Sequence, residues 1–155
     1  MCFDKLRNIR LVSVIPPSPQ RERASVSIAE LQAVLRQAVG SEGDIHLGDE
    51  RRWLPSIEDI EILLDADETN HYKYVKDTGD APEMYNCNHF AAHLYGQFNV
   101  PGWAQFAFGL QWTDTHALCL FVDQNQDVWW IEPQTDKRRS RLSDWQGSSN
   151  RFVVM

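Results

Sequence analysis

Apolar residues recur every three or four positions in three stretches of the chain, which is the spacing of one face of a helix. The first stretch follows a capping box at 27–30 and stops at Gly40, a common residue just after a helix. The second follows Ser56, a good N-cap residue. The third follows a loop expected at 77–82 and breaks at 100–102, where proline and glycine adjoin. The pattern predicts helices over residues 28–38, 57–64 and 86–95.

β-rich runs occupy the second half of the chain. Two of them flank a five-residue polar turn at 123–127, which predicts a β-hairpin. The aromatic segment 103–112 is expected to be extended, and a short strand at 152–154 is expected to join the same sheet. Near the start, residues 10–15 predict a strand that ends at the proline-rich stretch 16–19. The predicted strands are 10–15, 103–112, 117–122, 128–131 and 152–154.

The order of these elements predicts an α+β fold, with N-terminal helices and a cysteine-bearing helix packed on an antiparallel β-sheet. The chain has 155 residues, of which 43% are hydrophobic and 11% aromatic, and this is enough for one substantial core. We therefore expect a single domain over 1–155, in which residues 1–20 can form an extended N-terminal arm.

Charge and cysteine content exclude several classes of function. The formal net charge is -7, whereas binding to a phosphate backbone needs a dense basic surface, so nucleic acid is not an expected partner. The apolar stretch 11–15 is too short for a secretory core or a membrane span. Three cysteines without zinc-site or disulfide spacing are typical of a reduced, intracellular chain. We expect a soluble, cytoplasmic protein.

Cys87 is the main candidate for chemistry. On a helical wheel it shares a face with Phe90, Ala91 and Leu94, so it begins an apolar stripe at the first turn of the third helix. Unpaired backbone N–H groups and the positive end of the helix dipole favour a thiolate over a thiol at such a position. The same N–H groups could hold a developing oxyanion in acyl transfer. Cys119, by contrast, alternates with leucines inside a strand and is expected in the core.

The predicted hairpin supplies partners for this thiol. A turn centred near Asn125 sets Leu118 opposite Glu132 and leaves His116 on the same face, one diagonal step away. A register slipped by one residue would move Glu132 to the other face. The hypothesis is that Cys87 attacks a carbonyl, His116 takes and returns the proton, and Glu132 orients the imidazole.

Two residues of the turn compete with Glu132 for the orienting role. Asp123 and Asn125 carry suitable polar groups, but side chains in a turn are expected to face water. Glu132 therefore ranks above them.

Three short motifs carry a resemblance to a known family. The sequence is similar to the papain-like peptidase module at the C-terminus of MOA-type mushroom agglutinins, and related small bacterial and phage proteins look similar. The resemblance covers about residues 53–145 and implies a papain-like fold with Cys87, His116 and Glu132 as the catalytic triad. The motifs are YNCNHFA at 85–91, THA at 115–117 and WIEPQT at 130–135.

The resemblance also bears on cofactors and substrates. It implies a protein or peptide substrate and calcium dependence, because the agglutinin module depends on calcium. Relatives often have acidic residues beside the cysteine, whereas this chain has Asn86, Asn88 and His89, and hard cations prefer carboxylates. We therefore expect no cofactor, with calcium as the alternative that the resemblance implies. Sugar binding does not carry over, because the lectin domain of those agglutinins is absent from this sequence.

Other interpretations of the same residues stay open. Trp103, Trp112 and Trp130 are candidates to line a substrate groove, although core packing is the simpler use of such side chains. His89 and His93 have the spacing of a helical zinc pair, but the wheel turns them away from Cys87, so an exposed polar face is preferred and no metal site is expected.

Two wider alternatives remain. The basic run 137–141 could attract an acidic partner, but a solvated turn is the simpler interpretation. For the whole chain, the alternative to an enzyme is a catalytically inactive papain-like module that binds a protein partner.

Overall fold

A computed structural model describes residues 15–17, 23–79, 84–145 and 149–155. Residues 10–14 of the expected strand and most of the expected N-terminal arm lie outside these ranges. The three helices are α1 (Ile28–Val39), α2 (Ile57–Leu64) and α3 (Cys87–Phe98), with short 3-10 turns at Thr69–His71 and Leu142–Asp144. The strands are β1 (Ser25–Ser27), β2 (Asp44–His46), β3 (Arg51–Trp53), β4 (Phe108–Thr113), β5 (Ala117–Val122), β6 (Val128–Glu132), β7 (Lys137–Arg139) and β8 (Asn150–Val154).

The three predicted helices are confirmed, and each begins at a side-chain cap. Ser27, Ser56 and Asn86 occupy the three N-cap positions, and each accepts a hydrogen bond from a backbone N–H of the first turn. Each start is a capping box, in which the third helical residue bonds back to the N-cap backbone. The local sequence therefore fixes where α3 begins, and it begins at Cys87.

The strands form one six-stranded sheet and one two-stranded sheet. The order in the large sheet is β2-β8-β4-β5-β6-β7, and the small sheet pairs β1 with β3. All neighbours in the large sheet are antiparallel except β2 and β8, which pair in parallel. The hairpin of β5 and β6 and the terminal strand β8 confirm the strands predicted at 117–122, 128–131 and 152–154.

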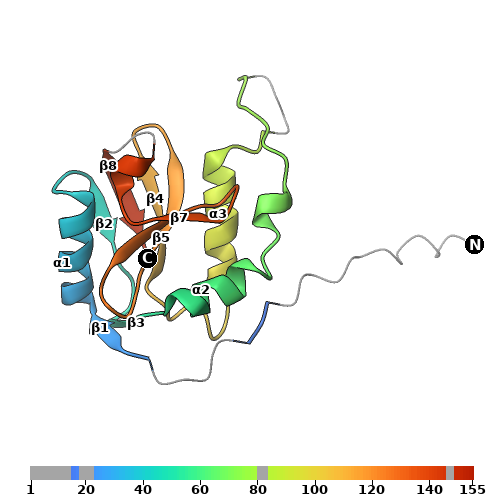
Figure 1. The fold of residues 1–155 in the computed structure, drawn as a ribbon. Helices are drawn as coiled ribbons and strands as arrows, with labels where there is room; N and C mark the ends of the chain where they lie inside the picture. The colour runs from blue at the N-terminus through green and yellow to red at the C-terminus, as the bar shows by residue number, and fades with distance from the viewer. Residues whose placement is uncertain (1–14, 18–22, 80–83, 146–148) are drawn as a thin grey trace, which may run out of the picture.

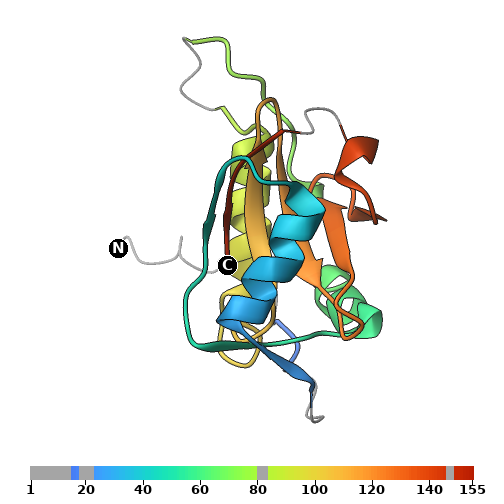
Figure 2. The same ribbon diagram turned by 90° about the vertical axis from the view of Figure 1, so that its left-hand side faces the viewer.

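Helices cover both faces of the large sheet. Figures 1 and 2 show α1 on one face and α3 on the other, with α2 near the lower end of α3. Strand β5 divides its side chains between the two layers: Leu118 and Leu120 pack with α1, while Cys119 and Phe121 pack with α3. A strand buried on both faces appears as a continuous apolar run, which explains the sequence pattern at β5.

Two expectations need correction. The segment 103–112 is not extended throughout, because turns occupy 101–105 and β4 begins only at Phe108. The basic run is not a solvated turn: residues Lys137–Arg139 form the edge strand β7, and Arg138 pairs with Glu61 at 2.5 Å. Charged side chains are common on edge strands, where they discourage pairing with other chains. No helix within the described ranges is long and apolar enough to span a membrane.

Candidate functional site

Cys87 is the first residue of α3 and is half-buried. Its N-cap neighbour Asn86 accepts a hydrogen bond from Asn88 N at 3.1 Å through the side-chain oxygen. The helix is anchored on its apolar side, as the wheel predicted, by Phe90, Ala91, Leu94 and Phe98. The thiol is thus placed at the rim of the core, at the N-terminus of α3.

His116 and Glu132 meet across the hairpin. His116 Nε2 lies 2.6 Å from Glu132 Oε2, and the two side chains are 19% and 12% exposed. The register pairs Cys119 with Ile131 and, continued by one residue, sets Leu118 opposite Glu132, as the turn length predicted. The short contact in a mostly dry environment holds one ring nitrogen of His116 in a fixed direction.

Both members of this pair are supported by turns. The hydroxyl of Thr113, which is 2% exposed, accepts a hydrogen bond from His116 N at 2.9 Å and donates one to His116 O at 3.0 Å. This bridge closes the turn between β4 and β5 just before the histidine. On the other strand, Glu132 Oε1 accepts bonds from Gln134 N at 3.3 Å and Gln134 Nε2 at 3.2 Å. Both carboxylate oxygens of Glu132 are therefore engaged.

A cavity of about 500 Å³ joins the thiol to the histidine of this pair. Cys87 and His116 both line it, together with Asn88, Trp112 and Arg151. Trp112 Nε1 donates a hydrogen bond to Asn88 Oδ1 at 2.6 Å, and this bond links the first turn of α3 to β4. The structure therefore brings the cysteine and the histidine to one opening.

A second cavity, of about 240 Å³, lies on the other side of the histidine. It is lined by Thr115, His116, Glu132 and Trp145. The indole N–H of Trp145 is buried and finds no hydrogen-bond acceptor among the described residues.

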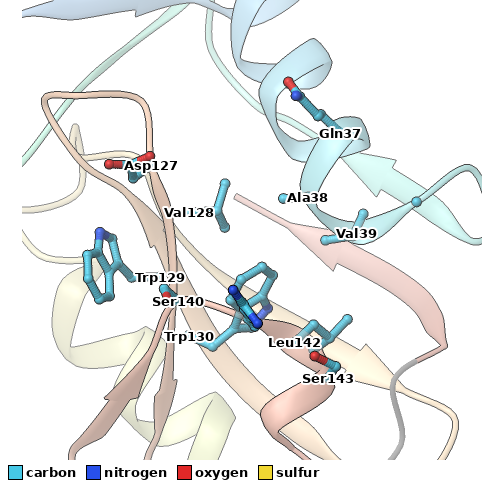
Figure 3. Close-up of a pocket in the computed structure, with 12 residues that line it drawn as sticks. Gln37, Ala38, Val39, Asp127, Val128, Trp129, Trp130, Ser140, Leu142 and Ser143 are labelled. Atoms are coloured by element: carbon cyan, nitrogen blue, oxygen red, sulfur yellow. The ribbon is translucent and has the colours of Figure 1, made fainter.

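The three tryptophans proposed for a substrate groove lie in different places. Only Trp112 lines the cavity beside Cys87. Trp103 is 1% exposed and donates its indole N–H to Pro16 O at 2.6 Å. Trp130 is 2% exposed, donates to Gln111 Oε1 at 2.6 Å, and lines a separate cavity of about 770 Å³ between α1 and β6. Figure 3 shows that cavity, with Val39 on one side and Trp130 with Leu142 on the other.

The competing candidates have structural roles. Asp123 does not face water as expected: it is 2% exposed, and its carboxylate accepts bonds from Asn125 N at 2.8 Å, Asp127 N at 3.0 Å and Trp129 Nε1 at 3.0 Å. It organises the turn, and this fixes the hairpin register. Cys119 is buried in the core, where its thiol donates to Ala91 O at 3.3 Å and desolvation raises its pKa well above the ordinary value.

The two histidines of α3 do not form a metal site with other ligands. His93 Nδ1 is 2.8 Å from Tyr85 Oη, and its ring packs on Tyr72. His93 is thus part of an aromatic cluster and not of the exposed face expected for it, whereas His89 is exposed. Among the described residues, no three histidine, cysteine or acidic side chains gather as a metal site.

Sequence reasoning missed three side chains around the site. Thr113 and Trp145 gave no signal, because their positions depend on chain turns that the pattern does not specify. Asn88 follows the candidate cysteine directly, but the sequence led us to consider it only as a residue found where relatives have an acidic calcium ligand. Its contact with Trp112 joins two segments that are 24 positions apart.

Solved structures share this fold. A complex of PSL1a, a Polyporus squamosus lectin, with E64, an inhibitor of cysteine proteases, matches with a TM-score of 0.68 and 19% identity over 84% of this chain and 50% of that chain. The P. squamosus lectin bound to the epitope Neu5Aca2-6Galb1-4GlcNAc matches with a TM-score of 0.64 and 17% identity over 84% and 49%. The chain spans about half the length of these proteins. No protein-family model and no curated protein matches the sequence.

The structural matches confirm the predicted fold class. The α+β arrangement of three helices on a six-stranded, mostly antiparallel sheet matches the protease-like part of PSL1a. The chain thus shares its fold with about half of a protein that was solved in complex with E64. The resemblance to the mushroom agglutinins, first seen in three short motifs, therefore holds for the fold.

Proposed function

We propose that this chain is a cysteine-dependent hydrolase or acyl transferase of the peptidase or amidase type, acting on an amide bond of a protein or peptide. The observation that carries the proposal is the 2.6 Å contact between His116 Nε2 and Glu132 Oε2, made by a histidine that lines the same cavity as Cys87. A nucleophile, a base and an orienting carboxylate in this order are the parts that thiol-based acyl transfer needs.

The role of His116 follows from which of its two ring nitrogens remains available for proton transfer. Glu132 occupies Nε2 of His116, so Nδ1 is the nitrogen left to take the proton of the Cys87 thiol. The sulfur then forms a bond to the substrate carbonyl carbon, and the carbonyl oxygen carries the negative charge. When the tetrahedral intermediate collapses, the C–N bond breaks and the leaving amine takes the proton from His116.

The second half of the cycle regenerates the thiol. His116 removes a proton from water, the oxygen attacks the thioester carbon, and the C–S bond breaks to release the acid. The sulfur leaves as a thiolate and takes a proton back from the protonated imidazole, so the enzyme returns to its starting state. Another acceptor in place of water gives acyl transfer by the same steps.

The E64 complex of PSL1a supports this assignment, because a cysteine-protease inhibitor binds a protein that contains the same fold. The resemblance of the three motifs also supports it, because it implies that Cys87, His116 and Glu132 are the triad. Substrate contacts are proposed for Trp112 in the cavity. Trp103 and Trp130 lie in the core away from this cavity, so their proposed contact with substrate has no support from the geometry.

The test is the alkylation rate of each cysteine as a function of pH. Iodoacetamide labelling, followed by peptide mass spectrometry, is compared in the wild type and in His116→Ala, with the buried Cys119 as an internal control. We expect Cys87 to react fast well below pH 8.5, about where an ordinary thiol ionises, and the variant to lose this reactivity. Slow labelling of Cys87 that only follows unfolding would contradict the enzyme and leave a module that binds a partner.

E64 provides an independent check. We expect one molecule of E64 to be attached to Cys87 in the wild type and none in His116→Ala or in Cys87→Ala. The reaction is run in calcium and in chelator, because the family resemblance implies calcium dependence and the residues beside Cys87 do not. Labelling that needs calcium would show that this chain keeps a metal requirement.

A further inference from the structure

The side chain of Asn88 is held by one end. Its oxygen Oδ1 accepts a hydrogen bond from Trp112 Nε1 at 2.6 Å, and the Cys87 thiol lies 3.9 Å from the same atom. An indole N–H can only donate, so the oxygen of the amide must face Trp112. The other end, Nδ2, has no hydrogen-bond partner among the described residues, and both of its N–H groups are available to a ligand.

Asn88 is exposed and lines the cavity that Cys87 and His116 share. A second donor is free close by. In the first turn of α3, Asn86 Oδ1 accepts a hydrogen bond from the backbone N–H of Asn88. The backbone oxygen of Asn86 accepts hydrogen bonds from the N–H groups of His89 and Phe90. The backbone N–H of Cys87 has no acceptor within the described part of the chain.

We propose that the Asn88 side-chain amide and the Cys87 backbone N–H together stabilise the oxyanion that forms when the thiol attacks a carbonyl. This assignment rests on the proposed function and adds a catalytic residue to it. The negative charge appears on the carbonyl oxygen next to the new C–S bond. The hydrogen-bond donors must therefore lie close to the sulfur and point at that oxygen. Asn88 follows Cys87 directly, and its amide nitrogen faces away from Trp112.

Trp112 is then a positioning residue. A free asparagine side chain samples several rotamers and both amide orientations, and each costs part of the stabilisation. The bond to Trp112 fixes one orientation before substrate binds. Trp112 itself is supported by its contact with Phe152 of β8, with ring centroids 4.4 Å apart.

The alternative is that the Trp112–Asn88 bond only fastens α3 to β4. Two substitutions of Asn88 separate the alternatives. Asn88→Asp keeps an oxygen for Trp112 and loses the N–H donors, while Asn88→Ala loses both. If the bond were only a fastening between α3 and β4, Asn88→Asp would acylate as fast as the wild type once both are compared at full ionisation of the thiol, because the new carboxylate lies close to the sulfur and disfavours the thiolate. If the amide donates to the oxyanion, both variants lose acyl transfer.

The experiment compares two reactions of the same thiol. Acylation of Cys87 by p-nitrophenyl acetate, followed by release of nitrophenolate in a single turnover, passes through an oxyanion. Alkylation by iodoacetamide does not. Both rates are extrapolated to the fully ionised thiol, because the carboxylate of Asn88→Asp disfavours the thiolate. On that basis we expect Asn88→Ala and Asn88→Asp to slow acylation by about a hundredfold, the usual effect of removing one oxyanion donor, and to change the alkylation rate by less than about threefold. Trp112→Phe keeps the ring contact and should slow acylation by about tenfold, because the amide is released.

The outcomes distinguish this inference from the proposed function. Equal losses in acylation and alkylation, or wild-type acylation in Asn88→Asp, would overturn the role of Asn88. A wild-type Cys87 that alkylates fast but is never acylated would overturn it as well. Slow alkylation that does not depend on His116 would instead overturn the proposed function itself. Thermal unfolding of each variant shows that the compared proteins are folded.

Discussion

Asp136 lies in the turn that follows Glu132, and it is predicted to make stability depend on pH. Its Oδ2 accepts a hydrogen bond from Asn70 Nδ2, while Asp136 Oδ1 and Asn70 Oδ1 are both buried with no donor among the described residues. Burial, and then the charge of Asp67, raise the pKa of Asp136 from 3.8 to about 6, with a smaller contribution from Asp65. The bond from Asn70 and the nearby His71 act in the opposite direction.

Protonation of Asp136 gives both of these unpaired oxygens a hydrogen-bond partner. A proton on Asp136 Oδ1 can be donated to Asn70 Oδ1, and the acid and the amide are then joined by two hydrogen bonds. A carboxyl with a raised pKa binds its proton more tightly in the folded protein than in the unfolded chain. Its contribution to stability is therefore full below about pH 4 and is lost as the pH rises through about 6, the folded-state pKa.

The magnitude follows from the same shift. A rise in pKa from 3.8 to about 6 corresponds to about 3 kcal/mol, at about 1.4 kcal/mol for each tenfold change in proton affinity. Because Asp136 is only partly buried, solvent screens the interaction, and we expect about 1 to 2 kcal/mol.

The perturbation is Asp136→Asn. The asparagine amide donates permanently where the acid donates only when protonated, and asparagine tolerates the positive φ of 54° at this position. Urea unfolding between pH 4 and pH 8 should show the variant about 1 to 2 kcal/mol more stable than the wild type at pH 8, with the difference vanishing near pH 4. The matched control is Asp127→Asn, an exposed acid in the other hairpin turn, which should leave the pH dependence unchanged.

Two results would refute this reasoning. One is an Asp136→Asn variant that is less stable than the wild type at pH 8. The other is a variant that keeps the wild-type slope of stability against pH between 4 and 7. Stabilisation of the wild type by calcium at pH 8, lost in the variant, would show that a cation and not a proton occupies the unpaired oxygens.

Three further predictions concern the supports of the site. Thr113→Val removes the hydroxyl that bridges His116 N and O, so we expect a loss of about 1 to 3 kcal/mol in urea unfolding and slower alkylation of Cys87, both largely restored in Thr113→Ser. Asn86→Ala removes the N-cap of α3, and we expect about 1 kcal/mol lower stability together with a lower alkylation rate of Cys87. Cys119→Ala leaves a small cavity in the core and should cost about 1 kcal/mol, while the pH profile of Cys87 alkylation stays unchanged.

The helix starts and the hairpin register were predicted correctly because each depends on residues that are close together in the sequence. The helix starts depend on a cap and one neighbour three residues away, so they are visible without the rest of the fold. The hairpin register depends on a turn that Asp123 closes through its own carboxylate, and it set Leu118 opposite Glu132 as expected.

Elements that depend on distant partners were missed. Strands β1, β2, β3 and β7 have three residues each, and their sequences carry little apolar alternation. They are ordered by the strands beside them, such as β8 for β2 and β6 for β7. The positions of Trp103 and Trp130 in the core, and the bond of Trp112 to Asn88, likewise required the three-dimensional packing.

The same division between local and distant signals governs the candidate site. The hairpin and its turns set the distance from His116 to Glu132, but the position of Cys87 relative to His116 depends on how α3 packs on β5. Small, fully buried side chains make this contact: Ala91 of α3 lies one turn after Cys87, and the thiol of Cys119 on β5 donates to its carbonyl. A larger side chain at either position would push the helix away from the sheet, because a filled core has no space to accept it. The helix would then carry the nucleophile away from its base while the pair of His116 and Glu132 stayed intact. Small residues behind the site are therefore as necessary for the proposed chemistry as the polar residues in it.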